Sequence, residues 1–263
     1  MYKDDKARRT LFPRYLTEYH TQAQWAEFTK LKEIIGNTYR SLERPILIFD
    51  IGIGTSRVPL LLSRVATWEK IGKYMGIDIS PFCVDRSRRV AKARRIDDKL
   101  EVVLFDALDL STRASELLKY GEYDLVVCTY FTAGDFKPDE IKLERKGGVI
   151  ANYDLGLLKP NKNFIAVFKG ALSLLRCGGQ VVIGSLYRDT PFVREIQEKF
   201  YKKCGMTVIT SEEDPFTATE EGFWSERFSK EKVYEYLPWI PRNRIEQTPL
   251  DDYDFAFMVS IKK

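Results

Sequence analysis

The sequence predicts an α/β fold in which helices cover both faces of a seven-stranded, mostly parallel sheet. Short apolar runs alternate with helical segments at the spacing of βαβ units, which places successive strands parallel in one sheet. The last two apolar runs lack a well-marked helix between them. We therefore expect those two runs to pair antiparallel at the edge of the sheet.

Local signals define the individual elements. Each expected strand is an apolar run, and the expected helices carry a capping residue, an early proline or a glycine stop. The expected strands lie within the segments 46–54, 73–80, 100–108, 123–134, 180–188, 206–211 and 254–263, the first of which ends in a glycine turn. The expected helices are 14–36, 55–66, 80–95, 161–179 and 191–205.

The composition is that of an ordinary globular domain, with 263 residues, 44% hydrophobic and 30% charged. No apolar run approaches the ~20 residues that cross a bilayer, and the first ten residues are charged, so neither membrane association nor a signal peptide is expected. The four cysteines form no C-x-x-C pair, which favours a reduced, cytoplasmic protein without structural zinc. Because His20 is the only histidine, most zinc sites and most histidine-based catalytic triads are excluded.

Three segments are interpreted as additions to the alternating core. Residues 1–40 are expected to form an N-terminal helical cap over the functional site, and 41–263 are expected to form the main domain. Within that domain, 135–160 is interpreted as a lid-like addition and 212–250 as a substrate-side insertion. Ordinary surface loops are the alternative for both.

The densest basic run, 85–99, has two interpretations. Its arginines and lysines spread around more than one helical face, as on a solvated helix. They would also suit a nucleic-acid surface, which the net charge of +4 permits but does not require.

The segment I-F-D-I-G-I-G-T-S-R, 48–57, places a glycine turn directly after the first expected strand, where ligands of open α/β sheets bind. A P-loop would need a lysine that does not follow, and a dinucleotide fingerprint would need glycine where the chain has Arg57. The remaining ligand is S-adenosyl-L-methionine, which has an amino-acid end, a ribose and an adenine but no pyrophosphate. Plain loop glycines are the alternative if the turn is taken alone.

Acids at the ends of three successive strands strengthen this interpretation. Asp50 closes the first strand and is followed by Gly52 and Gly54. Asp78 closes the second, where a carboxylate can accept both ribose hydroxyls, and Asp106 closes the third, where a carboxylate can accept the adenine amino group. Helix capping or loop solvation explains any one acid, but three together make coincidence improbable.

Five motifs together resemble the class I S-adenosylmethionine-dependent methyltransferases: F-D-I-G-I-G-T-S-R, G-I-D-I-S, L-F-D-A-L-D-L, Y-D-L-V-V-C-T-Y-F and L-L-R-C-G-G-Q-V-V-I-G. The resemblance covers roughly 45–211 and the final strand. It implies a Rossmann-like sheet of seven strands with the last strand antiparallel, and S-adenosyl-L-methionine as the cofactor. It also implies the cofactor-binding residues: Asp50, Gly52, Ile53, Gly54 and Thr55 around the methionine end, Asp78 and Ile79 at the ribose, Asp106 and Ala107 at the adenine, and Thr129 near the methyl group.

A second likeness is to the histidine-specific methyltransferase group of the ergothioneine pathway. It rests on G-I-G-T-S-R-V-P-L-L-L-S-R-V, G-I-D-I-S and F-T-A-G-D-F-K-P-D-E-I. That group has G-N-F where this chain has Gly134, Asp135 and Phe136. We interpret this likeness as an indication of a small amine substrate.

Candidates for the acceptor side come from segments around the core. Tyr130 and Asp135, which follow the fourth strand, are the catalytic candidates, because a nitrogen nucleophile of high pKa must lose a proton. Aromatic side chains beside a carboxylate suit an amine or a cation. The substrate-binding candidates are Tyr19, His20, Phe131, Phe136, Trp224 and Glu226, with packing as the alternative.

The sequence therefore predicts an S-adenosylmethionine-dependent methyltransferase that moves a methyl group, by in-line displacement, to a small-molecule nucleophile, an amine or other nitrogen. No N/D-P-P-Y/F/W motif follows the fourth strand, so the chain does not resemble the exocyclic-amine methylases of DNA and of some RNAs, which carry it. No metal-ligand cluster is visible, which disfavours a magnesium-dependent reaction. A tRNA or rRNA methyltransferase, a protein methyltransferase and a non-catalytic methyltransferase-like subunit stay open as alternatives.

Overall fold

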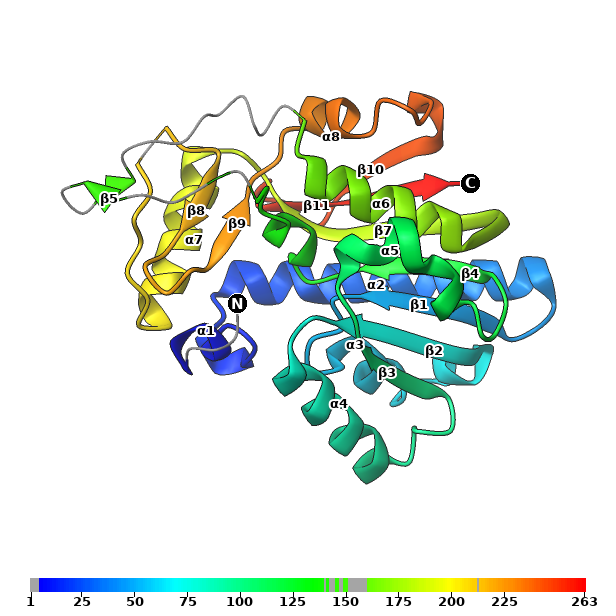
Figure 1. The fold of residues 1–263 in the computed structure, drawn as a ribbon. Helices are drawn as coiled ribbons and strands as arrows, with labels where there is room; N and C mark the ends of the chain where they lie inside the picture. Colours follow the sequence, from blue (N-terminus) through cyan, green and yellow to red (C-terminus); the bar gives the residue numbers. More distant parts are fainter. Residues whose placement is uncertain (1–4, 140, 142–144, 147–148, 151–159, 212) are drawn as a thin grey trace.

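The computed structural model describes residues 5–139, 141, 145–146, 149–150, 160–211 and 213–263. Its centre is a seven-stranded sheet with the strand order β10-β11-β7-β4-β1-β2-β3 (Figure 1). These strands are β1 (Ile46–Ile51), β2 (Ile71–Asp78), β3 (Leu100–Leu104), β4 (Tyr123–Cys128), β7 (Leu175–Tyr187), β10 (Ile245–Pro249) and β11 (Ala256–Lys262). Two short pairs lie outside it: β5 (Arg145–Lys146) with β6 (Val149–Ile150), and β8 (Phe216–Ala218) with β9 (Trp224–Glu226).

The strand directions confirm the predicted sheet. Strands β7, β4, β1, β2 and β3 are parallel to one another, and β11 is antiparallel to both β7 and β10. The fold is thus a mostly parallel, Rossmann-like sheet whose last strand is antiparallel.

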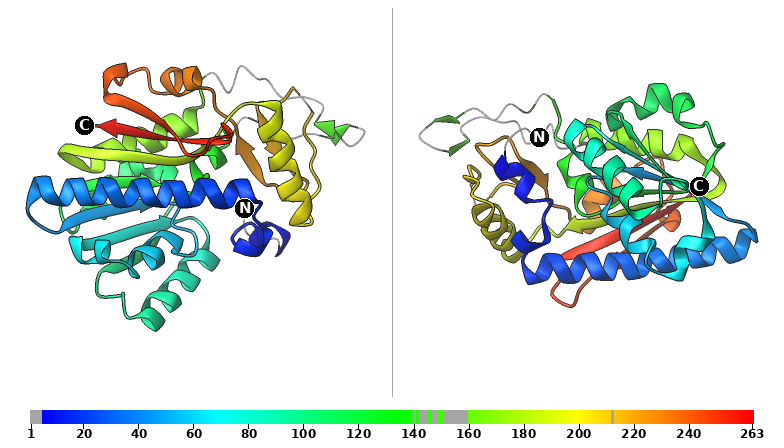
Figure 2. Two further views of the ribbon diagram at one scale, coloured as in Figure 1. Left: turned by 180° about the vertical axis from the view of Figure 1, so that it is seen from behind. Right: turned by 90° about the horizontal axis from the view of Figure 1, so that it is seen from below.

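Helices cover both faces of the sheet (Figures 1 and 2). The α-helices are α1 (Asp5–Arg9), α2 (Glu18–Leu42), α3 (Arg57–Leu62), α4 (Pro81–Arg94), α5 (Leu110–Arg113), α6 (Lys162–Leu174), α7 (Pro191–Lys203) and α8 (Lys230–Tyr236). The 3-10 helices are η1 (Pro13–Tyr15), η2 (Ala66–Lys70), η3 (Ala107–Asp109), η4 (Ala114–Leu117), η5 (Thr132–Asp135) and η7 (Arg242–Arg244).

The core is divided by the sheet into two layers, because side chains alternate between the faces of a strand. Ile48 of β1 belongs to an apolar cluster that includes residues of α2, α3, α4 and α7. Its neighbour Phe49 belongs to a second cluster that includes residues of α5, α6 and α8. Strands β1, β2, β4, β7 and β11 each contribute buried side chains to both clusters, as is typical of strands covered on both faces.

One predicted strand is wrong. The run 206–211 is not part of the sheet, and β10 takes the edge position beside β11 instead. Val208 makes only an isolated bridge to Thr219, and Ile209 packs with Phe216 and Trp224 in a small separate cluster. The 212–250 insertion thus contains a strand of the main sheet as well as the β8–β9 hairpin.

Two predicted helices have different ends. The helix predicted over 161–179 ends at Leu174, because β7 begins at Leu175 and contains the glycines that were expected to stop the helix. The N-terminal helix predicted over 14–36 runs from Glu18 to Leu42, with Thr17 as its N-cap residue. The predicted helix start at Ser80 is confirmed, since the Ser80 hydroxyl accepts a hydrogen bond from the Cys83 N–H.

The N-terminal segment has two parts. Helix α2 packs against β1, β7 and β11, so it is one of the layers of the domain (Figure 2). Helix α1 and the residues that follow it lie at the end of α2, beside the β8–β9 hairpin (Figure 1). Most of the predicted lid-like segment, 135–160, lies outside the described residues. Among the helices that are described, none combines the length and apolar character needed to cross a membrane.

Candidate active site

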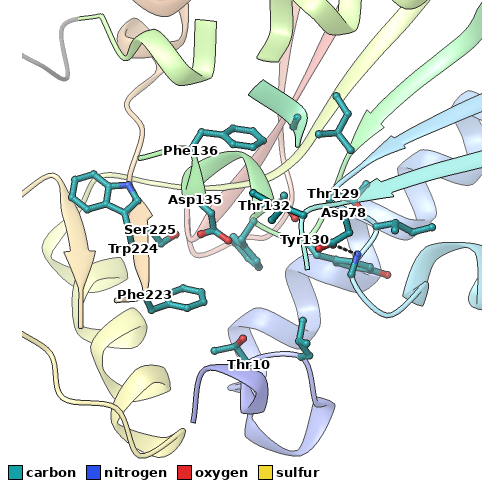
Figure 3. A pocket seen from close by; sticks show the side chains of 18 of the residues that line it. Thr10, Asp78, Thr129, Tyr130, Thr132, Asp135, Phe136, Phe223, Trp224 and Ser225 are labelled. Carbon is teal, nitrogen blue, oxygen red and sulfur yellow. Dashed lines mark hydrogen bonds between the residues drawn. The ribbon is translucent and has the colours of Figure 1, made fainter. Parts of the chain in front are cut away.

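A cavity of about 440 Å³ lies at the carboxyl ends of β1, β2 and β4 (Figure 3). This volume falls within the range of about 300–1,000 Å³ that is typical of small-molecule sites. One part of its wall is the loop after β1 and the ends of β2 and β3, and the other is formed by the segment after β4, the β8–β9 hairpin and the N-terminal helices. The cavity therefore lies where open α/β sheets bind their ligands.

The glycine turn after β1 requires glycine for two separate reasons. Gly52 and Gly54 have φ values of 71° and 59°, a backbone region that favours glycine. A Cβ at Gly52 would also lie 2.4 Å from Cγ2 of Thr132, so the turn fits directly under the segment after β4. The backbone N–H groups of Gly52 and Ile53 donate to the Ile77 carbonyl, which ties the turn to β2.

Asp78 holds the same turn and still faces the cavity. Its Oδ2 accepts from the Gly54 N–H and its Oδ1 from the Ser80 N–H, both at 2.8 Å. Burial raises the pKa of its carboxyl, and these two N–H groups oppose that shift. A carboxylate has about four acceptor positions, so roughly two remain for a ligand in the cavity. The side chain of Ile79 is 60% exposed and adds an apolar surface beside them.

Asp106, Ala107 and Thr129 also line this part of the cavity, as do Ile53 and Thr55. The Asp106 side chain accepts from the Leu108 N–H at 2.9 Å and caps η3, so its second oxygen is the one that can face a ligand. The structure thus brings together nine of the ten residues predicted to bind the cofactor.

Asp50 is the tenth, and it does not line the cavity. It is buried beneath the turn, where Oδ2 accepts a 2.7 Å hydrogen bond from the Tyr74 hydroxyl. Its Oδ1 has no hydrogen-bond partner among the described residues. Burial raises the pKa of Asp50 to about 8, against the effect of the Tyr74 hydrogen bond. The geometry makes Asp50 a support for the turn, and direct contact with a ligand stays a prediction.

The opposite end of the cavity is lined by aromatic side chains and by the Asp135 carboxyl group (Figure 3). Phe131 and Tyr187 stack with ring centroids 3.9 Å apart, and Phe223 lines the wall formed by the hairpin. Asp135 lies among these rings and faces Ser225. Burial raises the pKa of the Asp135 carboxyl well above its usual range, although the Ser225 hydroxyl acts in the opposite direction. No Lys or Arg side chain within the described ranges forms an ion pair with Asp135.

His20 contributes to this end of the cavity from α2. Its Nε2 lies 2.8 Å from the Tyr187 hydroxyl and its Nδ1 lies 2.6 Å from the Thr17 hydroxyl. Burial, and secondarily the charge of Lys203, lower the pKa of His20 to about 3. The imidazole is therefore neutral at physiological pH and is a poor proton acceptor.

The remaining predicted substrate residues have different positions. Phe136 lines the cavity, and Trp224 does so while being 1% exposed and stacked on Phe216 at 3.8 Å. Tyr19 lies outside the lining and packs edge-on against other aromatic rings. Glu226 also lies outside it: it accepts from the Tyr236 hydroxyl at 2.6 Å and the Asn161 amide at 2.9 Å. Glu226 therefore ties β9 to α8 and α6.

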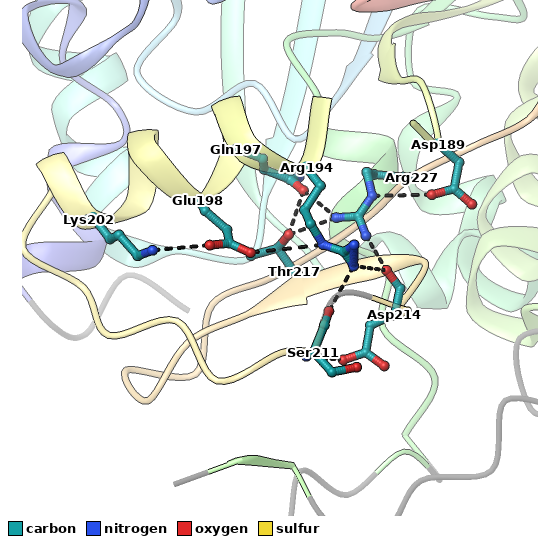
Figure 4. Close-up of polar contacts among 9 residues, drawn as sticks. All are labelled: Asp189, Arg194, Gln197, Glu198, Lys202, Ser211, Asp214, Thr217 and Arg227. Atoms are coloured by element: carbon teal, nitrogen blue, oxygen red, sulfur yellow. Dashed lines mark hydrogen bonds and ion pairs between the residues drawn. The ribbon is translucent and has the colours of Figure 1, made fainter. Parts of the chain in front are cut away.

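The hairpin that carries Phe223, Trp224 and Ser225 is held by a buried arginine (Figure 4). Arg227 Nη1 donates to Gln197 Oε1 at 2.9 Å and to Thr217 Oγ1 at 2.8 Å, and its Nε donates to Asp189 at 3.2 Å. A further Arg227 nitrogen donates to the Asp214 carbonyl. These contacts join β8, β9 and α7, so this wall of the cavity is fixed by a polar network beneath it.

Sequence reasoning missed several lining residues. They are Thr10, Leu11, Leu16, Gln24, Ile51, Arg57, Ile77, Phe105, Leu108, Thr132, Lys137, Asp139, Asn163, Tyr187, Phe200, Tyr201, Gly222 and Ser225. Tyr187 ends β7, so the rule that ligands lie at the carboxyl ends of strands could have found it. The N-terminal residues carry no local signal, because only the path of the chain brings them to the cavity. Within the described ranges, no three His, Cys, Asp or Glu side chains gather where a metal ion could be held.

No protein-family model matches the chain, and no curated protein matches it either. Solved structures do match. An S-adenosylmethionine-dependent methyltransferase from Clostridium acetobutylicum aligns over 89% of this chain and 91% of its own, with a TM-score of 0.54 and 11% identity. The chain has the fold of the class I methyltransferases. The PH0226 protein from Pyrococcus horikoshii aligns over 97% of this chain and 98% of its own, with a TM-score of 0.53 and 14% identity.

Proposed function

We propose that the chain is an S-adenosylmethionine-dependent methyltransferase that acts on a small molecule with an amine or other nitrogen nucleophile. One observation carries the proposal. A single cavity joins the glycine turn and Asp78 at one end to Asp135 and its aromatic neighbours at the other. A donor and an acceptor placed at these two ends would meet beside Thr129 and Tyr130.

The residues at the β1–β3 end fit the proposed cofactor. S-adenosyl-L-methionine, when bound, supplies an electrophilic methyl group on a sulfonium. The free acceptor positions of Asp78 suit two neighbouring ribose hydroxyls, and the exposed side chain of Ile79 suits the apolar face of a ring. The positive-φ glycines let a ligand approach the backbone closely. The structure has no phosphate-binding lysine at this turn, which agrees with a cofactor that lacks a pyrophosphate.

Asp135 is the residue that we assign to the acceptor. A buried carboxylate beside aromatic rings favours a cationic or hydrogen-bond-donating group. In the transfer, a bond forms between the acceptor nitrogen and the methyl carbon, the bond between that carbon and sulfur breaks, and the nitrogen loses a proton. The raised pKa of Asp135 makes its ionised carboxylate a stronger proton acceptor than that of an ordinary aspartate, whereas the lowered pKa of His20 makes its imidazole a weaker one than that of an ordinary histidine.

Asp135→Asn tests this assignment. We expect the variant to bind S-adenosylhomocysteine as the wild type does, because Asp135 is remote from Asp78. Its rate of S-adenosylhomocysteine formation with a panel of small primary and secondary amines should fall by about 100-fold or more, since a positioned proton acceptor contributes that much. Asp98→Asn, at an exposed aspartate after α4, is the control. An unchanged rate in Asp135→Asn would show that Asp135 does not accept the proton.

One feature of the surface favours an RNA substrate as the second candidate. Helix α4 and the residue after it present Arg88, Arg89, Lys92, Arg94 and Arg95 as exposed side chains. An electrostatic RNA contact weakens steeply with salt. Fluorescence anisotropy measures the binding of total tRNA at about 50 and about 200 mM salt, a range over which such contacts lose much of their affinity. We expect weak tRNA binding at both salt concentrations. Tight binding that weakens with salt would favour an RNA substrate.

A further inference from the structure

One face of α2 reaches three parts of the site. His20, Gln24 and Glu27 are spaced by four and three residues, so they lie on the same side of the helix. His20 contacts Tyr187 at the aromatic end, and Gln24 accepts from Arg57, which lines the cavity beside the glycine turn. Glu27 lies one turn further along and does not line the cavity.

Glu27 instead lies beneath the segment after β4. It is 1% exposed, and its two carboxylate oxygens accept from the Tyr130 N–H at 3.3 and 3.2 Å. Its Oε2 also accepts from the Ser185 hydroxyl. Gly184 makes room for this carboxylate, because a Cβ there would lie 2.4 Å from Glu27 Oε2. One buried side chain thus joins α2, β7 and the turn after β4.

The two residues that Glu27 contacts, and Phe131 after the first of them, have an unusual backbone. Tyr130, Phe131 and Ser185 have φ values of 53°, 67° and 49°, in the left-handed region that residues with a side chain rarely adopt. Such conformations persist only where the surrounding structure fixes them. The Tyr130 N–H would otherwise be a buried donor, and the Glu27 carboxylate satisfies it.

The turn that Glu27 holds determines where both ligands meet. Its first residues line the cavity beside the glycine turn, and Thr132 packs on Gly52. Its last residue is Asp135, the proposed acceptor residue, and Gly134 packs against the backbone of Glu226 in β9. A change in the backbone at Tyr130 therefore moves Asp135 relative to the cofactor end.

We propose that Glu27 is a positioning residue: its carboxylate fixes the 129–135 turn in its left-handed conformation and so sets the alignment of the acceptor with the methyl donor. The part of this proposal that concerns alignment rests on the proposed function. The part that concerns the turn does not, and it can be tested without an identified substrate.

Hydrogen–deuterium exchange is the first test, on wild type, Glu27→Ala, Glu27→Gln and the control Glu33→Gln. Glu33 lies on the exposed side of α2 and pairs with Lys30, away from the cavity. In Glu27→Ala, exchange in peptides that contain 130–135 should rise by about tenfold or more, because a hydrogen bond to a charged acceptor is lost. Glu27→Gln keeps one oxygen acceptor, so its exchange in these peptides should lie between that of the wild type and that of Glu27→Ala. If the alanine variant does not fold, the glutamine variant still provides the test.

Two outcomes would overturn the role in the turn. The first is unchanged exchange at 130–135 in both Glu27 variants. The second is a rise of the same size in peptides from β1, β3 and α6, because such a uniform rise reports only a loss of global stability. Turnover then tests alignment. We expect kcat for S-adenosylhomocysteine formation to fall at least tenfold in Glu27→Gln while KM for S-adenosylmethionine changes less than threefold. Local loosening with unchanged kcat would overturn the alignment role, and a wild type without turnover would instead contradict the proposed function.

Discussion

Asp78→Asn tests the cofactor end of the cavity most sharply, because the two side chains have nearly the same size. The amide keeps one oxygen, but its NH2 group cannot accept from either the Gly54 or the Ser80 N–H. A hydrogen bond to a charged group contributes about 1.5–3 kcal/mol, and the substitution removes one such bond inside the protein. For a chain of this size that corresponds to a fall in Tm of roughly 3–12 °C.

The same substitution should weaken the binding of the cofactor. Replacing one acceptor oxygen by a donor removes at least one charge-assisted bond to the ribose, so the Kd of S-adenosylmethionine should rise by about 10- to 150-fold. Titration calorimetry measures Kd, and circular dichroism at the same temperature shows that the variant is folded. Asp85→Asn, at an exposed aspartate of α4, is the matched control and should change neither quantity. A folded Asp78→Asn variant with the wild-type Kd would refute the assignment.

Three further predictions concern packing and pH. Trp224→Ala should lower the free energy of unfolding by about 3–5 kcal/mol in urea denaturation, because the indole is buried; a loss of turnover without a loss of stability would contradict this. Arg227→Met should cost about 3–5 kcal/mol in the same assay, because it removes the buried hydrogen bonds that Arg227 donates to Gln197, Thr217 and the Asp214 carbonyl; a neutral result would show that the network is dispensable. The apo protein should lose stability as pH rises from about 4 to 8, because burial raises the folded-state pKa of Glu27 to about 7 and that of Asp50 to about 8. The pKa of His20 is lowered from 6.5 to about 3, so His20 has the opposite effect on stability between these two pH values. In thermal melts from pH 5 to 7, Glu27→Gln should show a weaker decline, and an unchanged slope would contradict the raised pKa of Glu27.

The positions of the first five sheet strands along the chain could be predicted from the sequence, because each is a mainly apolar run of the kind that a buried parallel sheet requires. The edge strand could not. β10 reads I-E-Q-T-P and is only partly buried, so it lacks the apolar pattern of the others. The run 206–211 has that pattern, but its buried residues Met206 and Ile209 pack into two small clusters away from the sheet. Burial alone does not distinguish a strand of the sheet from a segment packed against an insertion.

Some residues of the candidate site could be predicted from the sequence, and others could not. Gly52, Gly54 and Asp78 were predictable, since a turn between strand and helix dictates residue types locally. Glu226 and Trp224 show the limit of composition, because an aromatic and acidic segment suggested substrate contact, whereas Glu226 binds α8 and most of Trp224 is packed on Phe216. The role of α2 depends on a contact between residues far apart in the chain, and no local pattern reports it.

The central claim is that this cavity binds S-adenosylmethionine, and titration calorimetry of the wild-type chain tests it most directly. The chain is titrated with S-adenosylmethionine, S-adenosylhomocysteine, NAD and ATP. The account predicts binding of both methionine-derived ligands at one site per chain and none of NAD or ATP. Binding of NAD or ATP alone, or of no ligand at all, would contradict it.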